Sequence, residues 1–244
     1  MKNKLILKPY KKEFDYSYTS GAYATYELIE IKPEIVKAVY IHSRYSNKEE
    51  MERVCRDNKI TFLYDDKTFI RISQKENSYI IGVFEKHSYI LDKSKPHVVL
   101  VNPSDMGNIG TIIRTMAGFN IHNLAIITPA ADIFNPKTIR ASMGALFRIN
   151  FQLFNSFEEY RQIYSRHWCY PFMLKGEICL NIDNCSEGNL FSLIFGNEAT
   201  GLDESFLGIG TSVKIPSSDL VDSLNLSIAA GIGIFTFASK NGLI

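Results

Sequence analysis

The chain has 244 residues, of which 45% are hydrophobic and 22% charged, and its formal net charge is +1. These values are ordinary for a globular protein, and the length allows one large or two modest domains, each with its own core. No apolar run approaches a membrane span and no secretory segment begins the chain, so we expect a cytoplasmic protein. Its four cysteines form no CxxC pair and its five histidines are scattered, so we expect no metal site.

The expected elements fall on either side of a Lys- and Pro-containing linker at residues 91–96. Before the linker, helical and strand patterns alternate, which predicts a small α/β domain over residues 1–92. The expected helices of this domain are 21–31 and 47–58, and the expected strands are 36–41, 60–64 and 78–84.

After the linker, residues 97–244 contain strands that are apolar throughout, which is typical of a parallel sheet covered on both faces. The expected strands are 97–101, 124–127, 191–195 and 212–215, and the expected helices are 108–119, 135–144, 156–166 and 225–240. The last helix is so rich in Ala, Gly, Ile and Phe that we expect it to be buried nearly all round, in the core or in a subunit interface. The predicted fold class is α/β.

Three segments combine an apolar strand with a turn rich in Gly, Asn or Ser. They are residues 102–119 (NPSDMGNIGTIIRTMAGF), 195–202 (FGNEATGL) and 215–230 (IPSSDLVDSLNLSIAA). Turns at the ends of parallel strands build ligand sites largely from backbone. The GxGxxG fingerprint is absent, which argues against a nicotinamide-dependent oxidoreductase.

The polar residues of these segments are the candidate site. Arg114 lies among apolar residues, so it either grips a phosphate or hydroxyl oxygen or forms a structural ion pair. We expect it to share a helix face with Asn108, six residues earlier. Glu198 can cap local amides or accept from a ligand, and Ser223 and Asn225 are either helix N-caps or site residues.

Taken together, the three segments resemble the SpoU (TrmH-type) family of RNA ribose 2′-O-methyltransferases, within the SPOUT superfamily. The resemblance spans essentially all of residues 97–244 and includes the motif RASMGA at 140–145. In their pattern of helices and strands, the first 92 residues resemble the substrate-binding domain, similar to ribosomal protein L30e, that many family members carry. The resemblance implies a C-terminal parallel sheet with a deep trefoil knot and a small N-terminal α/β domain.

The resemblance also implies a cofactor and a mechanism. S-adenosylmethionine would lie in the knot, with Gly196, Ile215 and Leu224 at cofactor-contacting positions. The polar residues that match the family's catalytic pattern are Arg114, Asn108, Glu198, Ser223 and Asn225. The family's proposed base is the arginine, but a guanidinium stays protonated near neutral pH, so holding phosphate and ribose is its other possible role. The apolar last helix would form a homodimer interface.

The implied substrate is RNA, with rRNA ahead of tRNA, because an L30e-like module recognises folded RNA. The first 26 residues interleave lysines and tyrosines, which fits either an RNA-binding arm or a tail whose tyrosines pack on the domain. These residues are Lys2, Lys4, Lys8, Lys11, Lys12, Tyr10, Tyr16, Tyr18, Tyr23 and Tyr26. A non-catalytic RNA-binding protein on the same fold is the alternative from another class.

Overall fold

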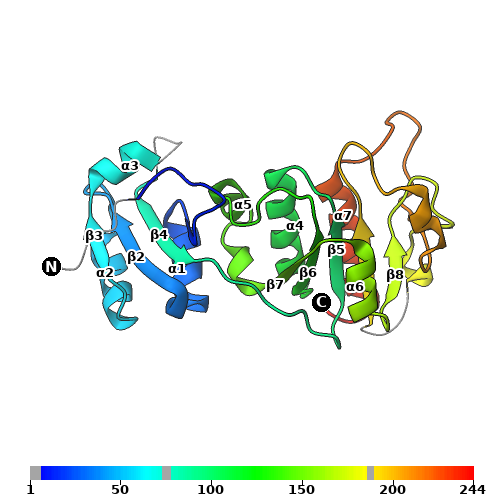
Figure 1. The fold of residues 1–244 in the computed structure, drawn as a ribbon, viewed down its shortest axis with the longest axis horizontal. Coiled ribbons are helices and arrows are strands. Elements are labelled where there is room, and N and C mark those ends of the chain that lie inside the picture. Colours follow the sequence, from blue (N-terminus) through cyan, green and yellow to red (C-terminus); the bar gives the residue numbers. More distant parts are fainter. Residues whose placement is uncertain (1–6, 73–77, 186–189) are drawn as a thin grey trace. The chain divides into compact units, whose positions relative to one another are not determined.

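The computed structural model describes residues 7–72, 78–185 and 190–244 (Figure 1). Its contacts divide the chain into two compact units. The N-terminal unit comprises Met1–His87 and Asp132–Phe147, and the C-terminal unit comprises Ser88–Ala131 and Arg148–Ile244. The segment Asp132–Phe147 therefore groups with the N-terminal unit, although the sequence pattern places it inside residues 97–244.

A four-stranded mixed sheet forms the centre of the N-terminal unit, in the order β1-β4-β2-β3. Its strands are β1 (Tyr16–Tyr18), β2 (Val36–Ile41), β3 (Phe62–Tyr64) and β4 (Ile80–Glu85). Strand β4 is antiparallel to β1 and β2, and β3 is parallel to β2. The helices are α1 (Ala22–Ile31), α2 (Lys48–Asp57), α3 (Asp66–Ile72) and α5 (Pro136–Ala141), with 3₁₀ turns at Pro33–Ile35 and Ala145–Arg148.

Alternation along β2 explains how this sheet is covered on both faces. Val39 and Ile41 point to the core that includes Met51 of α2, whereas Tyr40 points to the core that includes Phe69 of α3. The expected strand 36–41 is confirmed. Strand β1 and helix α3 were not expected, because elements of three and seven residues are too short to show a period.

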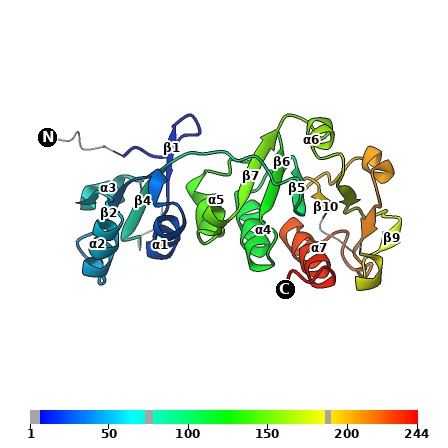
Figure 2. The same ribbon diagram turned by 90° about the horizontal axis from the view of Figure 1, so that it is seen from below.

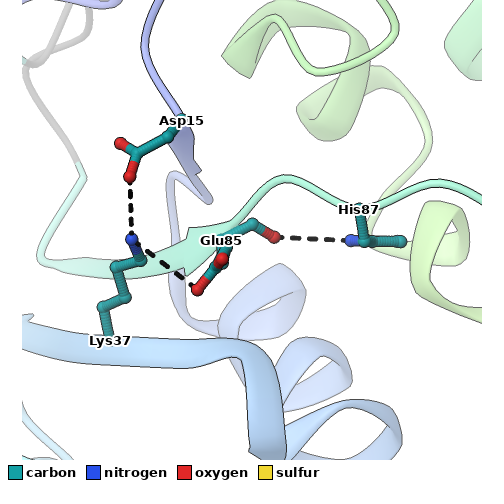
Figure 3. A network of polar contacts seen from close by, with 4 residues as sticks. All are labelled: Asp15, Lys37, Glu85 and His87. Atoms are coloured by element: carbon teal, nitrogen blue, oxygen red, sulfur yellow. Dashed lines mark hydrogen bonds and ion pairs between the residues drawn. The ribbon is translucent and has the colours of Figure 1, made fainter.

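Charged side chains link the strands of this unit at one place (Figure 3). The Lys37 ammonium lies 3.3 Å from a carboxylate oxygen of Asp15 and 3.7 Å from one of Glu85. The backbone carbonyl of Glu85 lies 3.4 Å from Nδ1 of His87, whose pKa is lowered by burial. Exposed pairs of this kind contribute little to stability, so the apolar cores hold the unit together.

Two tyrosines of the N-terminal stretch pack on their own unit. Tyr18 is buried, and its hydroxyl accepts a hydrogen bond from the backbone N–H of Tyr10 at 3.1 Å. The Tyr10 hydroxyl in turn donates to Asp132. These two side chains therefore fit the packed tail better than the RNA-binding arm, while Lys2 and Lys4 lie outside the described residues.

A five-stranded parallel sheet forms the centre of the C-terminal unit, in the order β7-β6-β5-β10-β8. Its strands are β5 (His97–Val101), β6 (Asn123–Ile127), β7 (Asn150–Phe154), β8 (Trp168–Pro171) and β10 (Phe191–Phe195). A separate two-stranded sheet pairs β9 (Ile178–Cys179) with β11 (Val213–Lys214). The helices are α4 (Met106–Gly118), α6 (Phe157–Ile163) and α7 (Leu226–Lys240), with 3₁₀ turns at Ile182–Asn184 and Glu204–Gly208.

The five-stranded sheet lies between α6 on one face and the packed pair α4 and α7 on the other (Figure 2). The expected strands 97–101 and 191–195 are confirmed, and the expected parallel α/β architecture is observed. The expected strand 212–215 is wrong in part, because only Val213–Lys214 is extended and it pairs with β9 outside the main sheet. Among the described residues, no helix has both the length and the hydropathy needed to cross a membrane.

Within this chain helix α7 is buried on one side only, so it is not central to the core, and the other expected alternative, a subunit interface, stays a prediction. Ile228, Ile232 and Phe235 are 54%, 37% and 51% exposed. Their spacing of four and three residues places them on one face of the helix. The opposite side, with Ile234 and Phe237, is fully buried against the sheet and α4.

Three glycines in the C-terminal unit allow backbone segments to pass very close to one another. A Cβ atom at Gly176 would lie 2.4 Å from the backbone of Val213, and one at Gly210 would lie 2.1 Å from that of Cys169. A Cβ atom at Gly196 would lie 2.2 Å from the backbone of Gly201. Real side chains do not tolerate such distances, so the path of residues 169–215 requires glycine at these positions.

Candidate functional site

Three loops carry the candidate residues in the C-terminal unit. The first connects β5 to α4, the second follows β10, and the third connects β11 to α7. Strands β5 and β10 are parallel neighbours, so the first two loops leave the same edge of the sheet. Such an edge is where open α/β sheets bind ligands.

Glu198, in the second loop, holds the first loop through four hydrogen bonds. One carboxylate oxygen accepts from the backbone N–H of Ser104 at 2.9 Å and from its hydroxyl at 2.7 Å. The other accepts from the N–H of Asp105 at 3.1 Å and from Nδ2 of Asn108 at 3.2 Å. Burial acts to raise the pKa of Glu198, but the hydrogen bonds from Ser104 and Asn108 lower it to about 2. The group is therefore a fixed carboxylate and not a proton carrier.

Asn108 connects Glu198 to the third loop. A carboxylate only accepts hydrogen bonds, so Asn108 must turn its amide nitrogen to Glu198, which leaves its oxygen free to accept. That oxygen accepts from Nδ2 of Asn225 at 3.1 Å. The Asn225 oxygen caps α7 by accepting from the backbone N–H groups of Ser227 and Ile228. Both amide orientations are thus determined by neighbours.

Asn197 adds a second connection between the first two loops. Its amide nitrogen donates to the carbonyl of Asn102 at 2.8 Å, and its oxygen accepts from the N–H of Ala199. Asn102 has a positive φ of 51°, a conformation that asparagine tolerates better than most residues. The loops after β5 and β10 are therefore held together by side-chain amides as well as by Glu198.

Arg114 is exposed on α4; one of its two alternative roles is not observed there, and its expected face is wrong. Within the part of the chain that the structure describes, no hydrogen bond or ion pair involves its guanidinium, so the structural ion pair is not observed. A helix turns about 100° per residue, so six residues separate Arg114 and Asn108 by about 120° around the axis. The expected common face is therefore wrong.

A cavity of about 390 Å³ lies beside the second and third loops. The three expected cofactor residues, Gly196, Ile215 and Leu224, all line it, as do Glu198 and Ser223. Cavities of this size hold nucleoside-sized ligands. Further apolar side chains that line it include Phe172, Met173, Leu174, Phe195, Leu202, Leu207, Val213 and Leu226.

The structure brings some of the predicted site residues into contact and leaves others apart. Glu198, Asn108 and Asn225 form one hydrogen-bonded chain, whereas Ser223 is exposed and makes no hydrogen bond to a described residue. Ser104 was missed, since nothing in a single sequence marks it as the donor to Glu198. Gly196 lines the cavity, and a Cβ atom there would meet the chain's own backbone at Gly201.

Comparison with known proteins bears on this site. A family model described as the SpoU rRNA Methylase family matches residues 95–235. The 23S rRNA (adenosine(1067)-2′-O)-methyltransferase of Streptomyces laurentii is 30% identical over 149 residues, 59% of this chain and 54% of that protein. The 23S rRNA (guanosine(2553)-2′-O)-methyltransferase of Bacillus subtilis is 22% identical over 205 residues, 83% of this chain and 81% of that protein. The chain spans about half the length of several curated relatives it matches.

Solved structures share the fold. A crystal structure of an AdoMet-bound rRNA methyltransferase from Sinorhizobium meliloti has a TM-score of 0.78 at 24% identity, over 92% of this chain and 87% of that one. A structure described as giving insight into 2′-OH methylation of C/U34 on tRNA has a TM-score of 0.55 at 26% identity. The match covers 61% of this chain and 97% of the solved chain.

Proposed function

Because the chain belongs to the SpoU rRNA methylase family, we propose that it transfers a methyl group from S-adenosylmethionine to a ribose 2′-hydroxyl of RNA. The observation that carries this proposal is the hydrogen-bonded chain Glu198–Asn108–Asn225, which joins three loops beside a cavity of nucleoside size. When bound, the cofactor would supply a methyl group on a positively charged sulfur; an oxygen nucleophile attacks the methyl carbon in line with the C–S bond, and the sulfur leaves as a neutral thioether. The protein must orient the hydroxyl and stabilise its developing negative charge.

The cavity is the proposed cofactor site. Gly196, Ile215 and Leu224 line it, and they match the family's cofactor-contacting positions. Its many apolar side chains suit an adenine ring, and the loops around it offer backbone groups for the polar edges. The Sinorhizobium meliloti relative crystallised with AdoMet supports the choice of cofactor.

Arg114 is the proposed contact to RNA. Its guanidinium is exposed and has no partner among the described residues, so it is available to a phosphate and a ribose oxygen. A guanidinium stays protonated, so it stabilises the developing alkoxide, and the proton leaves to phosphate or water. Asn108 orients the ribose, Ser223 shapes the hydroxyl pocket, and Glu198 fixes the loop that carries Asn108.

Ribosomal RNA is the proposed substrate. The Bacillus subtilis relative, whose name states a 23S rRNA nucleotide, aligns over 83% of this chain, including much of the N-terminal unit. The solved structure connected with tRNA methylation matches 61% of this chain, and the match takes in nearly all of the solved chain. The other part of this chain therefore has no counterpart in that protein. We assign that part, an L30e-like module, the role of binding folded rRNA.

A homodimer with a knotted C-terminal unit completes the proposal. The exposed face of α7, with Ile228, Ile232 and Phe235, gives a second copy an apolar surface to cover. The close backbone approaches at Gly176 and Gly210 support a chain path threaded through itself between residues 169 and 215. Knots are rare in proteins, and a threaded path needs backbone segments that pass one another without intervening side chains.

Methyl transfer to RNA tests the proposal. Labelled S-adenosylmethionine is incubated with total RNA from cells lacking this protein, because native sites are otherwise already methylated. We expect label in a large rRNA fraction, at a ribose 2′-oxygen. Label in tRNA would keep the proposed chemistry but change the substrate. Cofactor binding without label in any fraction would favour an assembly intermediate or a missing partner as the substrate, and no cofactor binding would favour the non-catalytic alternative.

A further inference from the structure

Two charged side chains that line the cavity form an ion pair, and neither of them has a role in the methyl transfer step proposed above. The Lys175 ammonium lies 3.1 Å from a carboxylate oxygen of Glu204. The two side chains are 79% and 80% exposed, so the pair lies on the solvent side of the cavity. An exposed pair of this kind is held weakly and exchanges partners at little cost.

The backbones that carry the pair are more firmly placed than the side chains. Lys175 lies in a turn closed by a hydrogen bond from the Gly176 N–H to the Met173 carbonyl. Gly176 packs directly on the backbone of Val213, which leaves the turn no room to shift inward. Glu204 begins a 3₁₀ turn that Asp203 caps by accepting from the N–H of Ser205 at 2.9 Å. The two charges can therefore rearrange locally while staying at the cavity.

The other charged groups of the cavity do not offer the same combination. Both oxygens of Glu198 already accept two hydrogen bonds each, so this carboxylate has no capacity for a further cation. Lys214 also lines the cavity, but none of the described carboxylates pairs with it. Among the charged side chains that the structure describes around the cavity, Lys175 and Glu204 alone present opposite charges side by side.

S-adenosylmethionine ends in an amino-acid group whose ammonium and carboxylate are attached to one carbon. We propose that Lys175 and Glu204 are the receptor for this zwitterion, Lys175 binding its carboxylate and Glu204 its ammonium as the ion pair opens. The inference rests on the proposed function, since it requires the cofactor to occupy this cavity. The reacting methyl group must lie toward Asn108 and Asn225, so the adenine takes the apolar interior and the amino-acid end is left for the charged side.

Calorimetric titration with two ligands tests this assignment without any methyl transfer. S-adenosylhomocysteine carries the zwitterion, whereas 5′-methylthioadenosine keeps the nucleoside and lacks the amino-acid group. We expect Lys175→Gln and Glu204→Gln each to weaken S-adenosylhomocysteine binding about fivefold and to leave methylthioadenosine binding unchanged. Lys95→Gln, an exposed linker lysine away from the cavity, is the matched control and changes neither ligand.

Exchanging the two charged residues distinguishes binding of the amino-acid group from a purely structural ion pair. The double variant Lys175→Glu/Glu204→Lys keeps an ion pair but reverses its direction, so we expect S-adenosylhomocysteine binding to stay weak. Recovery of affinity in the double variant, an equal loss in Lys214→Gln, or parallel losses for both ligands would each overturn the assignment. If the wild-type protein binds neither ligand, the proposed cofactor site itself fails, which is a separate result.

Discussion

Asn225 donates a hydrogen bond from its side-chain nitrogen to the side-chain oxygen of Asn108 at 3.1 Å, which joins the start of α7 to the first turn of α4. The same Asn225 oxygen caps α7, and the Asn108 nitrogen donates to Glu198. Neither amide can rotate without breaking a bond to another loop. The position of the Asn108 side chain therefore depends on both the second and the third loop.

Two substitutions of Asn225 separate its structural role from its positioning role. Serine still caps a helix but is too short to reach Asn108, so Asn225→Ser should lower methyl transfer at least tenfold with little change in stability. Asn225→Ala should lose about 1 kcal/mol of stability as well. Denaturant unfolding and kcat/KM measured on the same preparations check this. Equal methyl transfer in Asn225→Ser and wild type would remove Asn225 from the positioning network.

The Glu198 carboxylate should make part of the stability dependent on acid pH. Its pKa is about 2 in the folded protein and about 4.5 ordinarily, so its contribution is full above pH 4.5 and is lost as the pH falls toward 2. With its partial exposure to solvent, we expect about 1–2 kcal/mol. Glu198→Gln should lower stability at pH 7 and remove this part of the acid dependence. Unfolding midpoints at pH 6, 4.5 and 3 measure both effects, and an unchanged acid profile in the variant would contradict them.

Much of the C-terminal unit follows from the sequence because its signals are local. Strands 97–101 and 191–195 are apolar runs of the length that a doubly covered parallel strand needs. Asn225 begins α7 because an asparagine side chain satisfies free N–H groups at a helix start. The first two candidate segments converge because the loops of neighbouring parallel strands leave the sheet at one edge.

Other features depend on contacts between distant residues, which a single sequence does not contain. Ser104 and Glu198 are 94 residues apart, and Lys175 and Glu204 belong to different loops. Strand β11 looks like its apolar neighbours but pairs with β9 and, through one bridge at Val213, with Phe172, and not within the five-stranded sheet. The exposed apolar face of α7 has the same composition as a buried one, so composition alone could not distinguish the two.

Arg114 should affect methyl transfer without affecting folding. Its guanidinium has no partner among the described residues, so Arg114→Ala should unfold like the wild type and bind S-adenosylmethionine with similar affinity. Methyl transfer should fall at least 100-fold. Arg114→Lys should recover only part of it, because an ammonium lacks the planar fork that binds two oxygens. Weakened cofactor binding in Arg114→Ala would argue against this division of roles.

Gly196 should not tolerate even the smallest side chain. Its Cβ atom would lie 2.2 Å from the backbone carbon of Gly201, so Gly196→Ala must displace the second loop and should cost several kcal/mol. Gly118 is the matched control, since a Cβ atom there meets nothing within 4 Å and the residue lies in a helix. Gly118→Ala should be neutral or stabilising by up to about 1 kcal/mol. Thermal unfolding compares the two variants, and similar midpoints would show that the loop after β10 adjusts freely.

Two buried histidines should make the C-terminal unit less stable between pH 7.5 and 5.5. Burial, with His167 close by, lowers the pKa of His97 to about 3, and burial also lowers the pKa of His167. The unfolded chain gains the His97 proton below pH 6.5 while the folded chain does not, so His97 lowers stability by about 1.4 kcal/mol over this range, and His167 acts in the same direction. The neutral His97 ring donates from Nε2 to the Asp92 carbonyl at 2.8 Å, so its Nδ1 accepts from the Tyr160 hydroxyl at 2.9 Å. His97→Gln keeps one donor and one acceptor, so it should remove the part of the pH dependence that His97 contributes, about 1.4 kcal/mol, measured as urea midpoints at both pH values. An identical slope in the variant would assign the effect to other groups.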